Sequence, residues 1–179
     1  MAEAQGAALW LGRATFVALG VAVIFFALLP LDTGVPRWAP PDLLLALCLA
    51  WSARRPDLVP ALSIAAVALL ADLLYQRPPG LFAALTLLGC TYLKSRARSL
   101  RDAGFWVEWA TAAGVTLAIA VSYRAGLALV AVPQPPLGLF LVQAMTTVAA
   151  YPAVVVASRL FFGLRRSGAS DPAGARPGA

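Results

Sequence analysis

The sequence contains no histidine, only two cysteines and a small share of charged residues, 12%. Soluble globular domains carry about 25% charged residues, so this deficit excludes a water-soluble protein of ordinary composition. Hydrophobic residues instead make up 61% of the 179-residue chain. A composition this apolar is typical of an integral membrane protein, because long uncharged runs are stable where they leave water.

The missing histidines and the isolated cysteines also limit the chemistry. Metal sites in proteins are built mostly from His, Cys and carboxylate groups, whereas Cys48 and Cys90 each lie alone inside an apolar segment. We interpret them as small packing residues without a disulfide. The sequence also has no nucleophile elbow, HExxH motif, phosphate loop or paired acidic motif. It therefore predicts no enzyme activity, no catalytic residue, no metal site and no cofactor.

Six mostly apolar runs predict an all-α integral membrane protein, a compact bundle of about six transmembrane helices within a single domain, residues 1–166. The runs are 14–31, 42–53, 57–75, 78–94, 105–131 and 136–159. The first exceeds the length of about 7–15 residues of a signal-peptide core, so we expect an uncleaved helix. The second would rise only about 18 Å, against a hydrocarbon core of about 30 Å. It is either a short or tilted span or a re-entrant segment, which would leave five full spans.

Basic residues lie in clusters between these runs rather than in a stripe on a soluble face, so they predict topology and not nucleic-acid binding. The clusters, separated from one another by two runs, are Arg54 and Arg55; Lys94, Arg96, Arg98 and Arg101; and Arg159, Arg165 and Arg166. By the positive-inside rule this side is cytoplasmic, where the cations adjoin lipid head groups. With six spans both termini are cytoplasmic, although a re-entrant 42–53 would move the N-terminus to the other side. The segment 167–179, rich in Gly, Ala and Pro, is predicted to be a disordered cytoplasmic tail.

A carboxylate, Asp72, lies near the end of the run 57–75, just before a tight reversal at 76–80. The prolines of this reversal exclude continued helix, and its glycine permits close backbone approach. Three interpretations of Asp72 stay open. It anchors the short turn together with Arg77, it makes a polar contact to another helix, or it belongs to a proton or ion relay, for which no second carboxylate or histidine accompanies it within residues 58–75. Tyr75, three positions on, lies on the same helix face.

Two further charges lie within the run 105–131. Glu108, between two tryptophans at the expected cytoplasmic interface, is predicted to be solvated or paired with an arginine. Arg124, near the other end of the run, is expected either to extend outward along its aliphatic stem or to meet Asp72 or Asp42 inside the bundle.

Small residues recur within the same run, namely Ala110, Ala112, Ala113, Gly114 and Ala118. Small side chains let helices approach closely in a membrane, where no hydrophobic force drives their association. Because alanine is frequent throughout the chain, these residues do not by themselves identify a packing face.

The segment LLADLLYQRPPGLFAALTLLGCTYLKSRARS, residues 69–99, combines an Asp near a helix end, a short turn ending in Pro-Gly-Leu, a Leu-rich helix and a basic patch. With the earlier Pro-Asp-Leu-Leu-Leu at 41–45, it resembles the MreD family of bacterial rod shape-determining membrane proteins. The resemblance extends over roughly residues 10–162.

The resemblance implies a non-enzymatic, multi-pass protein of the bacterial inner membrane that acts as a scaffold subunit of the cell-wall elongation complex. Its implied partners are an MreC-like membrane protein and, directly or through it, the MreB filament, a RodA-type glycan polymerase and a penicillin-binding transpeptidase. The implied partner-binding residues are those of the hairpin, Asp72, Tyr75, Pro79 and Gly80. The basic loop 94–101 would face lipid head groups or cytoplasmic partners.

The family's fold is similar to the substrate-binding subunits of vitamin transporters, so an internal pocket is conceivable. The alternative function is therefore a small-molecule-binding membrane subunit of a transporter. Four polar residues would line its cavity: Asp42, Asp72, Arg124 and Gln143.

Overall fold

The computed structural model describes residues 2–29, 39–132, 134 and 136–162, and within these ranges the fold is all-α, as predicted. The described helices are α1 (Ala2–Leu28), α2 (Leu43–Arg54), α3 (Ala61–Leu74), α4 (Leu81–Asp102), α5 (Phe105–Leu129) and α6 (Leu137–Phe162), with a short 3-10 turn, η1 (Pro56–Leu58), between α2 and α3. Each helix overlaps one of the six predicted runs. The predicted cations Arg165 and Arg166 and the predicted disordered tail 167–179 lie outside the described residues.

Two helix boundaries differ from the predicted runs. The first helix begins at Ala2 rather than near residue 14, and α4 continues through the basic patch to Asp102. The run 57–75 is divided, because Pro60, which lacks a backbone N–H, caps α3 and separates it from η1. At the start of α4, Gly80 adopts a φ of +91°, which residues with a Cβ rarely adopt. Pro60 and Gly80 therefore mark the starts of α3 and α4.

Three of the described helices are long and apolar enough to cross a membrane. The candidate segments are Leu9–Leu28, Phe105–Leu129 and Leu137–Leu160, while Leu43–Arg54 and Ala61–Leu74 are apolar but shorter. The compact bundle is therefore made of long apolar helices combined with short ones. Whether all six cross the bilayer remains a prediction.

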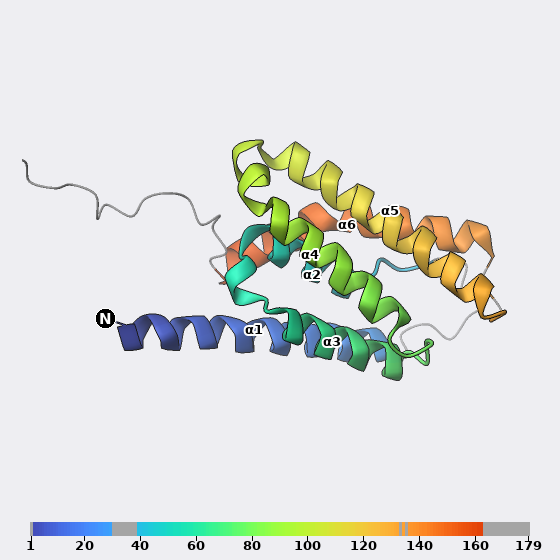
Figure 1. Cartoon of the computed structure of the whole chain (residues 1–179), viewed down its shortest axis with the longest axis horizontal. Helices are drawn as coiled ribbons and strands as arrows, with labels where there is room; N and C mark the ends of the chain where they lie inside the picture. The colour runs from blue at the N-terminus through green and yellow to red at the C-terminus, as the bar shows by residue number, and fades with distance from the viewer. Residues whose placement is uncertain (1, 30–38, 133, 135, 163–179) are drawn as a thin grey trace, which may run out of the picture.

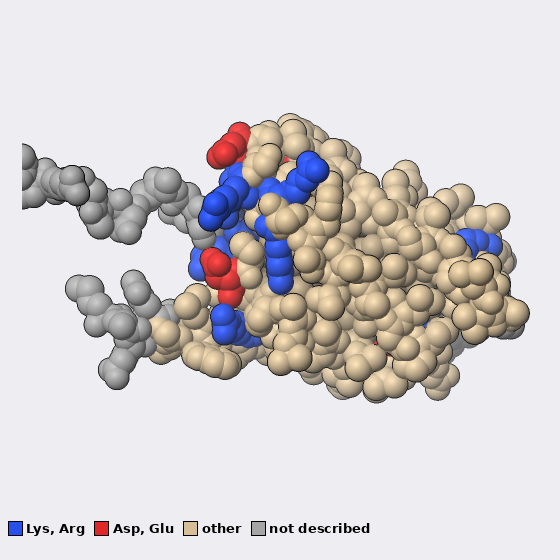
Figure 2. Space-filling model, in the orientation of Figure 1, with Lys and Arg blue, Asp and Glu red and all other residues tan. Residues whose placement is uncertain are grey.

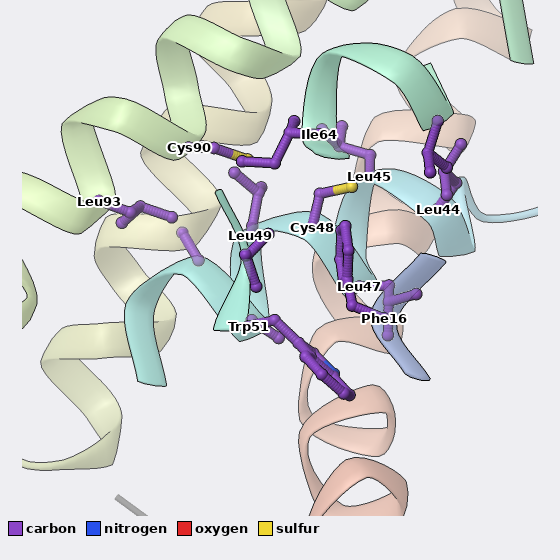
Figure 3. Close-up of a cluster of buried hydrophobic side chains, with 14 of the residues drawn as sticks. Phe16, Leu44, Leu45, Leu47, Cys48, Leu49, Trp51, Ile64, Cys90 and Leu93 are labelled. Carbon is purple, nitrogen blue, oxygen red and sulfur yellow. The ribbon is translucent and has the colours of Figure 1, made fainter. Parts of the chain in front are cut away.

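The short helix α2 lies at the centre of the bundle. Every residue from Leu44 to Arg54 is buried, as expected of a helix that is apolar on all sides and surrounded by others. Figure 3 shows Cys48, Leu49 and Trp51 of α2 among Ile64 of α3 and Cys90 and Leu93 of α4. The two cysteines are free and buried, as packing residues would be.

The centre of the bundle is only partly filled by α2, because α2 has 12 residues whereas α6 has 26. At about 1.5 Å per residue these correspond to about 18 Å and about 39 Å. The backbone N–H of Asp42 donates to Thr147 Oγ1 at 2.8 Å, and Trp51 Nε1 donates to Ser158 Oγ at 3.1 Å. Since these contacts place α2 beside the C-terminal part of α6, the N-terminal part of α6 extends beyond the start of α2.

The helix α1 packs against the bundle along one face and leaves the others open. Phe16 and Ile24 on that face are buried, and Gly20 approaches Val67 of α3 so closely that a Cβ would lie 2.6 Å from Val67 Cγ1. On the outer faces Trp10 and Leu11 are each 70% exposed. In Figure 1 α1 lies alongside α3, away from α5 and α6. The exposed apolar faces are suited to contact with lipid.

The two ends of the bundle differ in charge. We call one the basic end, defined by Arg54, Arg55, Lys94, Arg96, Arg98 and Arg101. Figure 2 shows basic side chains gathered at one end of the visible face, while most of the remaining face carries uncharged residues. The start of α1 and the end of α6 lie at this same end in Figure 1. We call the opposite end, with residues 76–80 and the connection between α5 and α6, the turn end.

Candidate functional site: a hairpin, a polar cavity and an apolar groove

The hairpin between α3 and α4 is held together by Asp72. Its Oδ2 accepts hydrogen bonds from the backbone N–H groups of Gly80, at 3.1 Å, and Ala83, at 3.0 Å. These groups belong to the first turn of α4, where N–H groups lack partners within the helix. The side chain of Asp72 is fully buried. Of the three interpretations left open by the sequence, this geometry corresponds to the anchor of the turn and, because Ala83 belongs to α4, also to a polar contact with another helix. The buried side chain has no surface for the partner contact that the resemblance implied.

The other hairpin residues are more accessible than Asp72. Pro79 is exposed at the tip, and Tyr75 and Gly80 are half-buried. Arg77 does not pair with Asp72. Its Nη1 lies 3.5 Å from Oδ2 of Asp42, and its guanidinium carbon lies 5.1 Å from the centre of the Tyr75 ring. The accessible residues of the hairpin are therefore Gln76, Pro79 and part of Tyr75.

At the basic end the structure corrects the expectation for Arg54. Its guanidinium is buried rather than directed to lipid head groups, because Nε and Nη2 donate to Oε1 and Oε2 of Glu108 at 2.7 and 2.9 Å. The hydroxyl of Tyr151 donates to the same carboxylate at 3.0 Å. Glu108 is therefore paired with an arginine, one of the two predicted alternatives, but it is not solvated. These contacts connect α2 with α5 and α6.

The remaining described cations of the predicted clusters differ in accessibility. Arg96, Arg98 and Arg159 are exposed, whereas Arg55, Lys94 and Arg101 are half-buried. The Lys94 ammonium group donates to the backbone carbonyl of Val59. The exposed arginines are thus the cations of these clusters that are accessible to anionic head groups.

A polar cavity of about 320 Å³ lies toward the turn end, between α2, α4, α5 and α6. Nine of its lining residues are polar or charged: Asp42, Gln76, Arg77, Thr116, Tyr123, Arg124, Gln134, Gln143 and Thr147. It occupies the part of the bundle that extends beyond the start of α2. Three of the four residues proposed from the sequence as cavity-lining are among these nine, and the fourth, Asp72, is not.

Three charged residues of the cavity, Asp42, Arg77 and Arg124, are each held by contacts with neighbouring groups. Asp42 caps α2, since its Oδ1 accepts from the backbone N–H of Leu45 at 2.9 Å while its Oδ2 faces Arg77. The guanidinium carbon of Arg77 also lies 4.7 Å from the centre of the Phe82 ring. That of Arg124 lies 5.4 Å from the ring of Phe140. Aromatic rings at such distances attract and orient guanidinium groups. Arg124 therefore faces neither Asp72 nor Asp42 in the described contacts.

An apolar groove of about 890 Å³ lies on the outside of the bundle, between α4 and α5. Small residues four positions apart line it from α5: Ala110, Gly114, Ala118 and Ser122. On the α4 side, Gly89 lets the two helices approach, because a Cβ there would lie 2.8 Å from both Ile119 Cδ1 and Val115 Cγ1. The sequence prediction missed this groove. The spacing of four was its signal, and the extension of that spacing to Ser122 separates it from the general abundance of alanine.

Within the described ranges, no three His, Cys, Asp or Glu side chains are grouped so that they could hold a metal ion. The features with a defined geometry are therefore the hairpin, the polar cavity and the apolar groove. Comparison of the chain with protein-family models, with curated proteins and with solved structures finds no match in any of the three.

Proposed function

We propose that this chain is a non-enzymatic, multi-pass scaffold of the bacterial inner membrane that holds the transmembrane helix of an MreC-like partner within the cell-wall elongation complex. The resemblance of residues 69–99 to the MreD family supports this assignment. Long apolar helices and their exposed apolar faces support a location in the bilayer. The MreB filament, the RodA-type polymerase and the penicillin-binding transpeptidase are reached directly or through this partner.

In this proposal all six helices cross the membrane and the basic end is cytoplasmic. The exposed Arg96 and Arg98 then adjoin anionic head groups, in accordance with the positive-inside rule. The hairpin tip at Pro79 lies on the opposite side. Reporter fusions in the connection 102–104 and at 76–80 test this arrangement, and a cytoplasmic location of 76–80 would contradict it.

The apolar groove between α4 and α5 is the observation that carries the scaffold function. Its lining extends along α5 from Trp106 to Ser122, about 24 Å at 1.5 Å per residue, most of the thickness of a hydrocarbon core. In lipid, helices associate where small residues permit close packing. A groove of this length with a row of small residues is suited to one transmembrane helix.

Gly114 offers a direct test of docking in the groove. A Cβ at this position would meet no heavy atom within 4 Å, so the side chain of Gly114→Leu starts into open space in the groove. Gly138→Leu is the matched control, since a Cβ there also meets nothing within 4 Å and Gly138 does not line the groove. We expect Gly114→Leu to abolish co-purification with a single-span MreC-like partner and to fail to restore rod shape in depleted cells. Normal co-purification and shape with Gly114→Leu would refute docking in the groove.

A second candidate function, the small-molecule-binding subunit of a transporter, is favoured by the polar cavity. The lining of this cavity by Asp42, Arg124 and Gln143 supports it. Saturable uptake of a substrate that depends on Arg124, in cells whose shape does not depend on the chain, would favour this function over the scaffold.

A further inference from the structure

We propose that the polar cavity binds a small anionic amphiphile, that is, a phosphate or carboxylate group joined to a short apolar body. The inference rests on the lining of the cavity and on neither partner docking nor transport. It would hold for a scaffold as well as for a transporter subunit.

The polar part of the lining is rich in hydrogen-bond donors. Gln76, Arg77, Arg124, Gln134 and Gln143 all carry N–H groups, of which Gln134 Nε2 already donates to the backbone carbonyl of Arg124 at 3.2 Å. Asp42 is the one carboxylate among the described lining residues. That carboxylate is already committed to the N-terminus of α2 and to Arg77. A guanidinium group has five N–H donors in a planar fork, so it can keep existing contacts and still bind a phosphate or carboxylate. The donors therefore favour an anionic group in the ligand.

The arginines are also held in position before any ligand arrives. Arg77 lies between the Asp42 carboxylate and the Phe82 ring, and Arg124 lies over the Phe140 ring. Arginine loses less freedom on binding when its planar group is already oriented. This arrangement differs from that of Arg98, which is exposed at the basic end.

The rest of the lining is apolar, so it favours a ligand that carries an apolar part in addition to its anionic group. Ile119, Leu127 and Phe140 line the cavity, and burial of an apolar body against them contributes about 25 cal/mol per Å². The volume of about 320 Å³ lies at the lower limit of the range of about 300–1,000 Å³ found for ligand pockets. It can hold a small molecule or a lipid head group with its nearest carbons, but not a whole phospholipid.

Hexyl phosphate is the probe for this inference, titrated calorimetrically into the full-length protein in phosphatidylcholine nanodiscs. We expect saturable binding that Arg124→Gln weakens about tenfold or more, as the loss of a charge-assisted hydrogen bond predicts. Arg98→Gln removes the same charge at the basic end and should change the dissociation constant less than about twofold. Ala120→Leu, which fills the cavity without removing a charge, should also weaken binding. Absence of saturable binding, or equal losses in Arg124→Gln and Arg98→Gln, would overturn the inference.

Competition experiments identify the source of the ligand. Inorganic phosphate and hexanol should each compete at least about tenfold less well than hexyl phosphate, because each supplies only half of the required chemistry. Equal competition by inorganic phosphate would overturn the amphiphile as the ligand class. If nanodiscs containing phosphatidylglycerol suppress hexyl phosphate binding, a lipid head group is the source. If they leave it unchanged, the source is a free amphiphile. Arg124 lines the cavity and not the groove, so Arg124→Gln should still co-purify with the MreC-like partner at wild-type yield. That result would show that ligand binding in the cavity and partner docking in the groove succeed or fail independently.

Discussion

Arg54 and Glu108 form a bidentate ion pair inside the protein, with N–O distances of 2.7 and 2.9 Å, although 54 positions separate them in the sequence. Their side chains are 2% and 3% exposed. A buried ion pair contributes little net stability compared with apolar residues of the same shape, but removing one partner leaves an uncompensated charge. The pair therefore specifies how α2 docks against α5.

Glu108→Gln should strongly destabilise the bundle, because it leaves the Arg54 guanidinium buried without a counter-ion. Breaking a buried pair costs about 3–5 kcal/mol, so we expect a marked fall in the thermal unfolding temperature in detergent. Asp102→Asn removes an exposed carboxylate near the same end and should have almost no effect. The double substitution Arg54→Met with Glu108→Leu should recover part of the loss. Equal stability of Glu108→Gln and wild type would show that the pair does not fix the docking of α2.

Asp72→Ala should loosen the turn end. The substitution leaves the backbone N–H groups of Gly80 and Ala83 without their acceptor, at a cost of about 1–3 kcal/mol. Asp72→Asn keeps an oxygen acceptor and should cost less. Thermal unfolding gives the stability, and the labelling rate of a cysteine placed at Pro79 gives the order of the hairpin. Faster labelling in Asp72→Ala than in Asp72→Asn is the expected result, and equal rates would argue against the anchoring role.

These two carboxylates illustrate what the sequence could predict and what it could not. The role of Asp72 depends on residues 8 and 11 positions away, within a turn whose prolines and glycine are visible in the sequence, so the anchor was among the predicted alternatives. The partner of Arg54, which belongs to α2, lies three α-helices further along the chain, in α5. Helix periodicity does not encode which helices become neighbours, so Arg54 was grouped with the exposed cations.

Gly20→Leu should separate α1 from the bundle. A Cβ at Gly20 would lie 2.6 Å from Val67 Cγ1, and overpacking of this kind typically costs about 1–3 kcal/mol. Gly6→Leu is the control, since a Cβ at Gly6 meets nothing within 4 Å. Disulfide cross-linking between cysteines placed at Gly12 and Leu58, where a Cβ at Gly12 would lie 2.7 Å from Leu58 Cδ2, would report the separation as a lower yield in Gly20→Leu. An unchanged yield would show that α1 is held by contacts other than this close approach.

Neither the position of the cavity nor that of the groove could be predicted from the sequence, because both depend on which helices pack against each other. The short run 42–53 predicted a helix of the observed length, but not that the neighbouring helices would extend beyond it and enclose a cavity there. That enclosure depends on the packing of α5 and α6 against α2, which involves residues such as Thr147 about a hundred positions from Asp42. Three of the four small residues of the groove on α5 were noted among other alanines, but only the packing of α4 beside α5 shows that they line a groove.

Substitutions at Gly89 and Gly114 distinguish the packing of α4 against α5 from the binding of a partner in the groove. Gly89→Ala places a Cβ 2.8 Å from both Ile119 and Val115, so α4 and α5 must move apart or these side chains must shift, at a cost of about 1–3 kcal/mol. We expect Gly89→Ala to lower both the unfolding temperature and the yield of co-purified single-span partner. Gly114→Leu should lower the yield alone, because the groove is open at that position. If Gly89→Ala reduces stability while partner binding stays intact, partner binding does not depend on the distance between α4 and α5. The partner must then dock on another face.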